Sequence, residues 1–83
     1  MVIHFAANTL PGTLYLSDSF VLFCSAEGLA ELATADHWRE HAHDTPCDIT
    51  IVHLSDVAGR DEGLFEVRRQ LQPIYTATRL YQG

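Results

Sequence analysis

The N-terminal part of the chain opens with a mostly apolar run in which His4 is the one polar residue. Residues 2–7 predict a strand, and the Pro-Gly pair within residues 8–12 predicts a turn after it. Residues 13–16 and 20–24 are β-rich runs, and the polar segment at 17–19 predicts a hairpin connection between them. Because residues 20–24 are apolar on both faces, we expect them to form a central strand.

Helical spacing begins after this run. Ser25 is a favourable N-cap, and apolar residues at helical spacing follow it from Leu29 onward. Trp38 lies nine positions after Leu29, about 180° around a helix that turns ~100° per residue. We therefore expect a break near residues 34–36 and a second short helix over 36–43 that buries Trp38. The Thr-Pro pair at 45–46 is expected to end this second helix.

The C-terminal half contains the clearest strand, residues 48–54, whose apolar residues face both sides and predict an interior position. Residues 61–71 carry an apolar stripe that predicts a helix, and residues 74–81 alternate and predict a polar edge strand. The expected element order is β-β-β-α-α-β-α-β. This order predicts a single α+β domain over residues 1–83, with a mostly antiparallel sheet of four to five strands and two to three short helices.

Charge is unevenly distributed along the chain. The net charge is −6, there is no lysine, and the first 48 residues hold seven acids against the single base Arg39. Proteins that bind nucleic acid need cationic side chains at the phosphates, so this composition argues against direct contact with nucleic acid. Basic helices of the kind that lie on membrane surfaces are also missing from the sequence.

The expected location is the cytoplasm. The N-terminus lacks a basic region followed by a long apolar run, so we expect no signal peptide. No stretch approaches the ~20 apolar residues that cross a bilayer. In this compartment Cys24 and Cys47 are expected to be free thiols, and their acidic and apolar neighbours are expected to raise the thiol pKa.

The central region resembles a GIY-YIG nuclease domain in layout. Residues 11–15 (PGTLY) are similar to that family's first motif strand, residues 21–25 (VLFCS) to its second, and residues 71–75 (LQPIY) to the exit that follows its last helix. The resemblance implies a small α+β fold. It also implies that Tyr15 holds the place of the first catalytic tyrosine.

The sequence departs from this family at its other catalytic positions. The second tyrosine's place holds Leu22 or Phe23, and Glu31 stands near the place of the helix arginine. Leu64 takes the place of the metal-binding glutamate, with Glu62 and Glu66 two residues to either side. A divergent nuclease that uses Tyr15 with Glu62 or Glu66 is therefore an alternative to the function favoured below.

Residues 37–41 (HWREH) match the H-x-x-E-H pattern of inverted zinc peptidases. On one helix, His37 and His41 would share a face, and Glu40 would be placed to act as a base. The chain is too short to hold that family's distant third ligand and its substrate cleft, so we interpret these residues as exposed helix histidines and expect no metal or cofactor. His4 and His53 lie in strand patterns and are expected to be core or edge histidines.

A row of carboxylates remains. Asp36, Glu40 and Asp44 recur every fourth residue and would line one helix face about 6 Å apart, while Glu27 and Glu31 form a second pair. Such a row imitates a phosphate strand, although a solvated acidic face is the plainer interpretation. With Trp38 as an aromatic anchor, the expected partner-binding residues are Glu27, Glu31, Asp36, Trp38, Glu40, Asp44 and Asp48.

These features favour a non-catalytic acidic inhibitor that binds a partner protein. In size and charge the chain resembles small phage-encoded anti-defence proteins, including anti-CRISPR proteins that mimic DNA. The resemblance implies a basic nucleic-acid-binding partner, such as a CRISPR effector, and no contact with a membrane. A structural or assembly module that pairs through its edge strands is a further alternative to the nuclease.

Overall fold

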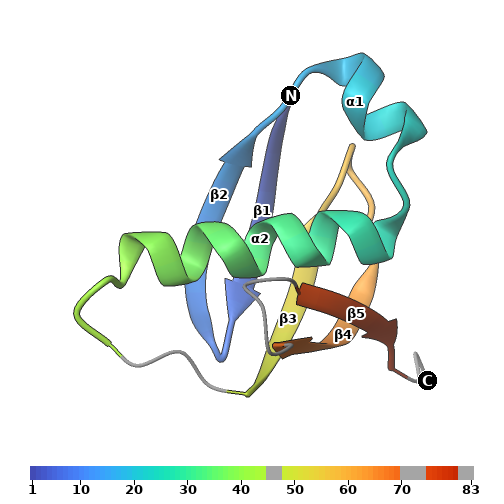
Figure 1. Cartoon of the computed structure of the whole chain (residues 1–83). Helices are drawn as coiled ribbons and strands as arrows, with labels where there is room; N and C mark the ends of the chain where they lie inside the picture. The colour runs from blue at the N-terminus through green and yellow to red at the C-terminus, as the bar shows by residue number, and fades with distance from the viewer. Residues whose placement is uncertain (45–47, 70–74, 81–83) are drawn as a thin grey trace.

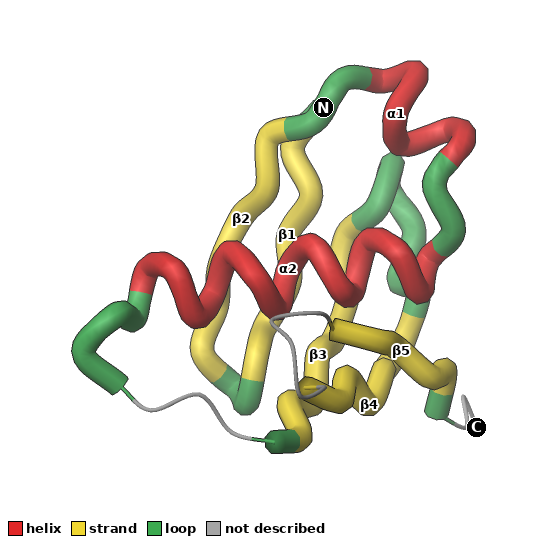
Figure 2. The backbone as a smooth tube through the Cα atoms, viewed as in Figure 1, coloured by secondary structure: helices red, strands yellow, loops and turns green. Residues whose placement is uncertain are grey.

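The computed structural model describes residues 1–44, 48–69 and 75–80. Five strands form one antiparallel sheet in the order β2-β1-β3-β4-β5, and the long helix α2 crosses one face of it (Figures 1 and 2). The expected α+β class is confirmed, with the order β-β-α-α-β-β-β. The elements are β1 Val2–Ala7, β2 Leu10–Tyr15, α1 Asp18–Phe23, α2 Ala26–Glu40, β3 Ile49–Asp56, β4 Gly63–Arg69 and β5 Tyr75–Arg79.

The core lies between the sheet and α2. Alternation along the strands turns one set of apolar side chains toward the helix, as the buried Ile3 and Phe5 of β1 and Val52 and Leu54 of β3 show. The expected strands at residues 2–7 and 48–54 are confirmed, and β3 lies at the centre of the sheet as predicted. The opposite face of the sheet is covered by neither of the two described helices.

The β1–β2 hairpin turns earlier than predicted. Its turn is Asn8-Thr9, both with positive φ (47° and 71°), and Asn8 is tied to β3 because its Oδ1 accepts from the Ile51 N–H at 2.9 Å. The predicted turn residues Pro11 and Gly12 lie within β2 instead. Gly12 is needed there because a Cβ at this position would lie 2.6 Å from Cζ of Phe5.

Residues 20–24 are not a central strand, and that prediction is wrong. Ser17, expected in a hairpin connection, is the N-cap of α1, and its Oγ accepts from the Phe20 N–H at 3.2 Å. Only Val21 of this helix is buried, whereas the Phe23 side chain is 91% exposed. A short apolar run carries no period that separates a strand from a helical turn, so local capping decides.

The predicted break in the second helical segment is also wrong. Ser25 caps α2 as expected, with its Oγ accepting from the Gly28 N–H at 3.0 Å, and the helix then continues to Glu40 without interruption. Trp38 does not require a break because it lies on the flank of α2 and donates from Nε1 to Thr50 Oγ1 in β3 at 3.1 Å. The Thr-Pro pair expected to end the helix falls outside the described residues, and the helix ends before it, with His41 as C-cap.

The predicted helix at residues 61–71 is wrong in its described part, because residues 63–69 form strand β4. Phe65 and Val67 are buried two residues apart, and Gly63 begins the strand with φ 87°, a conformation that does not start a helix. Over so short a run, the same apolar residues fit the period of a helix and the period of a strand. The edge strand expected over residues 74–81 is confirmed as β5, although its two terminal residues fall outside the described part of the chain.

Candidate functional site

The acidic residues predicted to bind a partner lie on two different flanks of α2. Strand β5 lies beside α2 (Figure 1). Glu27 and Glu31 face this strand. Glu27 lies 3.5 Å from the guanidinium of Arg79, and Glu31 Oε2 accepts from the Ala77 N–H at 2.7 Å. Both carboxylates hold the strand against the helix. They are therefore engaged within the fold.

Trp38 belongs to this same structural flank. Its indole N–H is bonded to Thr50, a fully buried residue of β3, and its ring packs edge-on against His37 with centroids 4.6 Å apart. The side chain is half-buried. The structure thus places the proposed aromatic anchor in the contact between α2 and the sheet.

Most of the remaining carboxylates also have partners within the chain. This matters because a carboxylate already bonded internally offers less to a cationic receptor. The contacts are Asp18 with the Met1 amino group, Asp56 with the Gly59 N–H, Asp61 with His53 and the Gly63 N–H, Glu62 with Arg79, and Glu66 with Arg68.

Three carboxylates differ from these. Glu40, Asp44 and Asp48 are exposed, and their side chains have no hydrogen-bond or ion-pair partner among residues 1–44, 48–69 and 75–80. Glu40 ends α2, and Asp44 follows in the next turn, where its N–H donates to the His41 carbonyl at 3.0 Å. Asp48 immediately precedes β3.

Asp36 completes the group around the end of α2. It lies one turn before Glu40, pairs with Arg39, and is mostly covered. Arg39 itself is largely exposed, so this pair is open to water and weak. We call Asp36, Glu40 and Asp44 the acidic end of the molecule. Of the seven predicted residues, the structure brings these three together.

His37 lies in the middle of the acidic end, and the prediction that it is an exposed helix histidine is wrong. Its side chain is 5% exposed, and its ring nitrogens have no hydrogen-bond partner among the residues that the structure describes. Burial, and after it the neighbouring His41, lowers the pKa of His37, while the charges of Asp44 and Asp36 act in the opposite direction. The ring is therefore a neutral imidazole at pH 7, with one nitrogen free to accept a hydrogen bond.

A cavity of about 370 Å³ opens between the edge strand β2 and the last turns of α2. From the helix it is lined by the acidic pair Asp36 and Glu40 and by His37 and His41, and from the sheet by Pro11, Gly12, Thr13, Tyr15 and Phe5. Phe5 belongs to β1 and reaches the cavity because Gly12 has no side chain to cover its ring. We call this cavity the β2–α2 pocket. Its volume lies at the small end of the range for ligand pockets.

The two histidines of the H-x-x-E-H pattern both line this pocket, but they are arranged differently from a metal pair. Their rings are tilted at 32° to one another with centroids 4.3 Å apart, and His41 Nδ1 donates to the main-chain oxygen of His37 at 2.7 Å. Within the described part of the chain, no three histidine, cysteine or carboxylate side chains are placed to hold a metal ion. The pocket offers carboxylates, an imidazole acceptor and the aromatic ring of Phe5, which is a set suited to an organic cation.

The residues singled out by the nuclease resemblance lie apart. Tyr15 ends β2, whereas Glu62 and Glu66 lie directly before and within β4, and β1 and β3 separate those two strands. Three strand spacings amount to about 14 Å. Such a distance is too long for Tyr15 to share one reacting centre with either glutamate.

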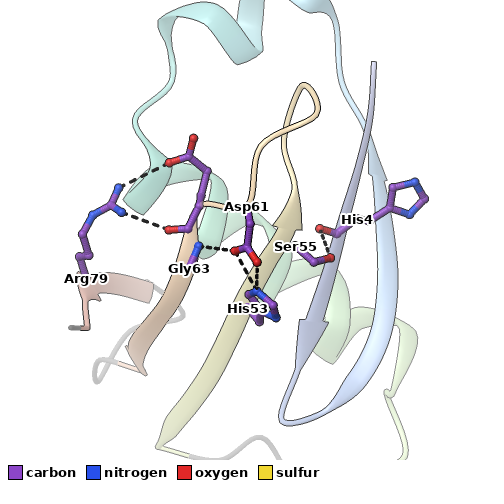
Figure 3. Close-up of polar contacts among 7 residues, drawn as sticks. His4, His53, Ser55, Asp61, Gly63 and Arg79 are labelled. Carbon is purple, nitrogen blue, oxygen red and sulfur yellow. Dashed lines mark hydrogen bonds and ion pairs between the residues drawn. The ribbon is translucent and has the colours of Figure 1, made fainter. Parts of the chain in front are cut away.

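A second group of polar contacts lies on the open face of the sheet (Figure 3). His53 Nε2 is 2.9 Å from Asp61 Oδ1, which also accepts from the Gly63 N–H at 2.8 Å. The Gly63 N–H, and after it His53, lowers the pKa of Asp61. Ser55 does not extend the pair into a triad, because its Oγ donates to the His4 carbonyl at 3.2 Å. The group fastens the β3–β4 connection to the sheet.

Two further observations bear on the sequence expectations. Cys24 is a free thiol, and burial, followed by the charge of Glu31, raises its pKa as expected, whereas Cys47 lies outside the described residues. Neither described helix is long and apolar enough to cross a membrane. Comparisons with protein-family models, with curated proteins and with solved structures found no match to this chain.

Proposed function

We propose that this protein is a non-catalytic inhibitor that binds a partner protein through its acidic end. The partner is a basic nucleic-acid-binding protein or complex, and the acidic end occupies the surface that would otherwise hold phosphates. This is the mode of action of the DNA-mimicking anti-CRISPR proteins that the chain resembles in size and charge. The compartment proposed for this action is the bacterial cytoplasm, with a CRISPR effector as one candidate receptor.

One observation carries the proposal. Glu40 and Asp44 are exposed carboxylates without a hydrogen-bond or ion-pair partner among the described residues, and they lie at the same end of α2. Like charges this close repel one another and lower stability slightly. The positive charges of a bound partner would offset this repulsion and would be attracted to the same carboxylates.

The neutral state of His37 supports the same role. A protonated imidazole would cancel part of the charge of Asp36, Glu40 and Asp44, but burial keeps this ring uncharged. The ring of His37 therefore adds no positive charge to the acidic end at pH 7. Complementary charge of this kind speeds association and makes it sensitive to salt.

Binding is tested by capture from a lysate of the native host. Immobilised protein is expected to retain a nucleic-acid-handling complex at low salt and to release it at high salt. The identified complex is then assayed for nucleic-acid binding with and without this protein, and added protein is expected to displace the nucleic acid. A complex that binds this protein and its nucleic acid at the same time would contradict the proposal.

A further inference from the structure

The main-chain groups of β2 that face away from β1 can be assigned from the register. Met1 and Leu16 are joined by two hydrogen bonds, N to O at 2.6 Å in one direction and at 3.0 Å in the other. In an antiparallel ladder such doubly bonded pairs alternate with unbonded pairs. Leu14, Gly12 and Leu10 therefore point their main-chain groups toward β1, and Thr13 and Tyr15 point theirs outward, together with the carbonyl of Pro11.

At the other edge of the sheet, formed by β5, an outward main-chain group is already bonded. On β5, the outward N–H of Ala77 is occupied by Glu31 of α2. No described residue donates to or accepts from the outward main-chain groups of Thr13 and Tyr15. Exposed edges of this kind are templates for an added strand. The edge of β2 is therefore available for pairing.

The β2–α2 pocket lies directly beside this free edge. A residue of an added strand that sits opposite Gly12 points its side chain to the same face of the sheet as Gly12, which is the face that α2 covers. That side chain enters the pocket, where Asp36, Glu40 and His37 line the helix side. In Figure 1 the last turn of α2 reaches past β2. The residues Glu40 and His41 at this end of the helix line the pocket.

The lining of the pocket selects the chemistry of that side chain. Two carboxylates and an imidazole nitrogen are acceptors, and the ring of Phe5 contributes aromatic surface. Guanidinium has five donors, no acceptor, and a flat face that stacks on aromatic rings. Lysine has three donors at one point and no flat face, so arginine fits this set of groups better.

We propose that the partner contributes a short extended segment that pairs with the free edge of β2 and places an arginine in the β2–α2 pocket, opposite Gly12. The inference rests on the proposed function, because it names how the acidic end engages a basic partner. Main-chain pairing supplies the orientation, and the arginine supplies the specificity. Pro11 has no N–H to donate and limits the added strand to a few residues.

The test uses a capped peptide of sequence TVRVT, titrated into ¹⁵N-labelled protein and followed by NMR. Bound antiparallel with its arginine opposite Gly12, the peptide is expected to shift the amide signals of Thr13 and Tyr15 and to slow their hydrogen exchange. Replacing the arginine by glutamine (TVQVT) is expected to weaken binding about tenfold, because a charge-assisted hydrogen bond is lost. Equal binding of the two peptides, or no shift at Thr13 and Tyr15 at about 10 mM peptide, where a millimolar complex is populated, would overturn the inference.

Methylated peptides separate edge pairing from simple charge attraction without altering the protein. In the proposed register the two valines face Thr13 and Pro11 and form the hydrogen bonds, whereas the arginine N–H points away from β2. N-methylation of both valines is expected to abolish binding, and N-methylation of the arginine alone is expected to preserve it. The double substitution Glu40→Lys/Asp44→Lys in the protein reverses two charges of the acidic end and tests the proposed function separately. If valine methylation has no effect on peptide binding while this variant fails to bind the partner, the strand pairing is refuted and the proposed function stands.

Discussion

Trp38 Nε1 donates to Thr50 Oγ1 across 3.1 Å, which links the last turns of α2 to the central strand β3. Thr50 is fully buried, and Trp38 is half-buried. Trp38 lies on the flank of α2, away from the stripe that contains Leu29. Because its indole reaches β3 from this flank, the helix needs no break to bring Trp38 against the sheet. The bond also fixes the part of α2 from which Asp36 and Glu40 project.

Thr50→Val is predicted to lower the free energy of unfolding by about 1–2 kcal/mol, because valine keeps the shape of threonine but leaves the indole N–H without its acceptor. Urea unfolding followed by tryptophan fluorescence measures the change. Thr78→Val, on the exposed side of β5, is the matched control, with an expected change within about 0.5 kcal/mol. Equal effects of the two substitutions would show that the bond to Trp38 contributes nothing.

Glu31→Ala is predicted to destabilise the protein by about 1–2 kcal/mol, because the Ala77 N–H loses its acceptor. Glu31→Gln keeps a side-chain oxygen at the same place and is expected to cost less than about 1 kcal/mol. The midpoint of urea unfolding separates the two variants. The assignment of Glu31 to a structural role would be wrong if both variants were as stable as the wild type.

His37 is predicted to make stability fall as the pH drops below about 6.5, the usual value for histidine. Its pKa is lowered in the folded state by burial, so between the folded and unfolded pKa values the unfolded chain binds more protons. Stability therefore rises with pH through this window and becomes independent of His37 above it. The lowered pKa of Asp61 adds a separate loss below about 3.8.

Unfolding free energies measured across this pH range test the assignment to His37. His37→Gln is expected to remove the dependence near pH 6, and the exposed substitution His43→Gln is expected to keep it. A His37→Gln variant with the pH dependence of the wild type would assign the titration to another group. His41 faces the same ring, so His41→Gln serves as a second comparison and is expected to leave a weaker dependence in place.

The elements that sequence reasoning predicted correctly are those with a distinctive local signal. Residues 2–7 form an apolar run of strand length, residues 48–54 carry apolar residues on both faces, and Ser25 marks the start of α2 with a capping side chain. The errors at residues 20–24 and 61–71 fall on short apolar runs in which helix and strand periods bury almost the same side chains. Such runs are decided by capping and by packing against distant elements.

The candidate site was predictable only in part, for a related reason. The spacing of Asp36 and Glu40 along α2 showed that they share a flank. The partners of Glu27 and Glu31 lie in β5, some fifty residues away in the chain, so no local pattern could show that these carboxylates are engaged. The free edge of β2 and the neutral ring of His37 depend on strand order and burial, which only the folded structure provides.

The most direct test of the account compares two double variants of equal charge. Each acid-to-lysine change adds two positive charges, so Glu40→Lys/Asp44→Lys and Asp18→Lys/Glu66→Lys both move the net charge from −6 to −2. With folding verified by circular dichroism, affinity for the captured complex is measured for both. The account predicts that the first variant no longer binds and that the second binds as the wild type does. Equal affinities of the two variants would contradict a binding role for the acidic end.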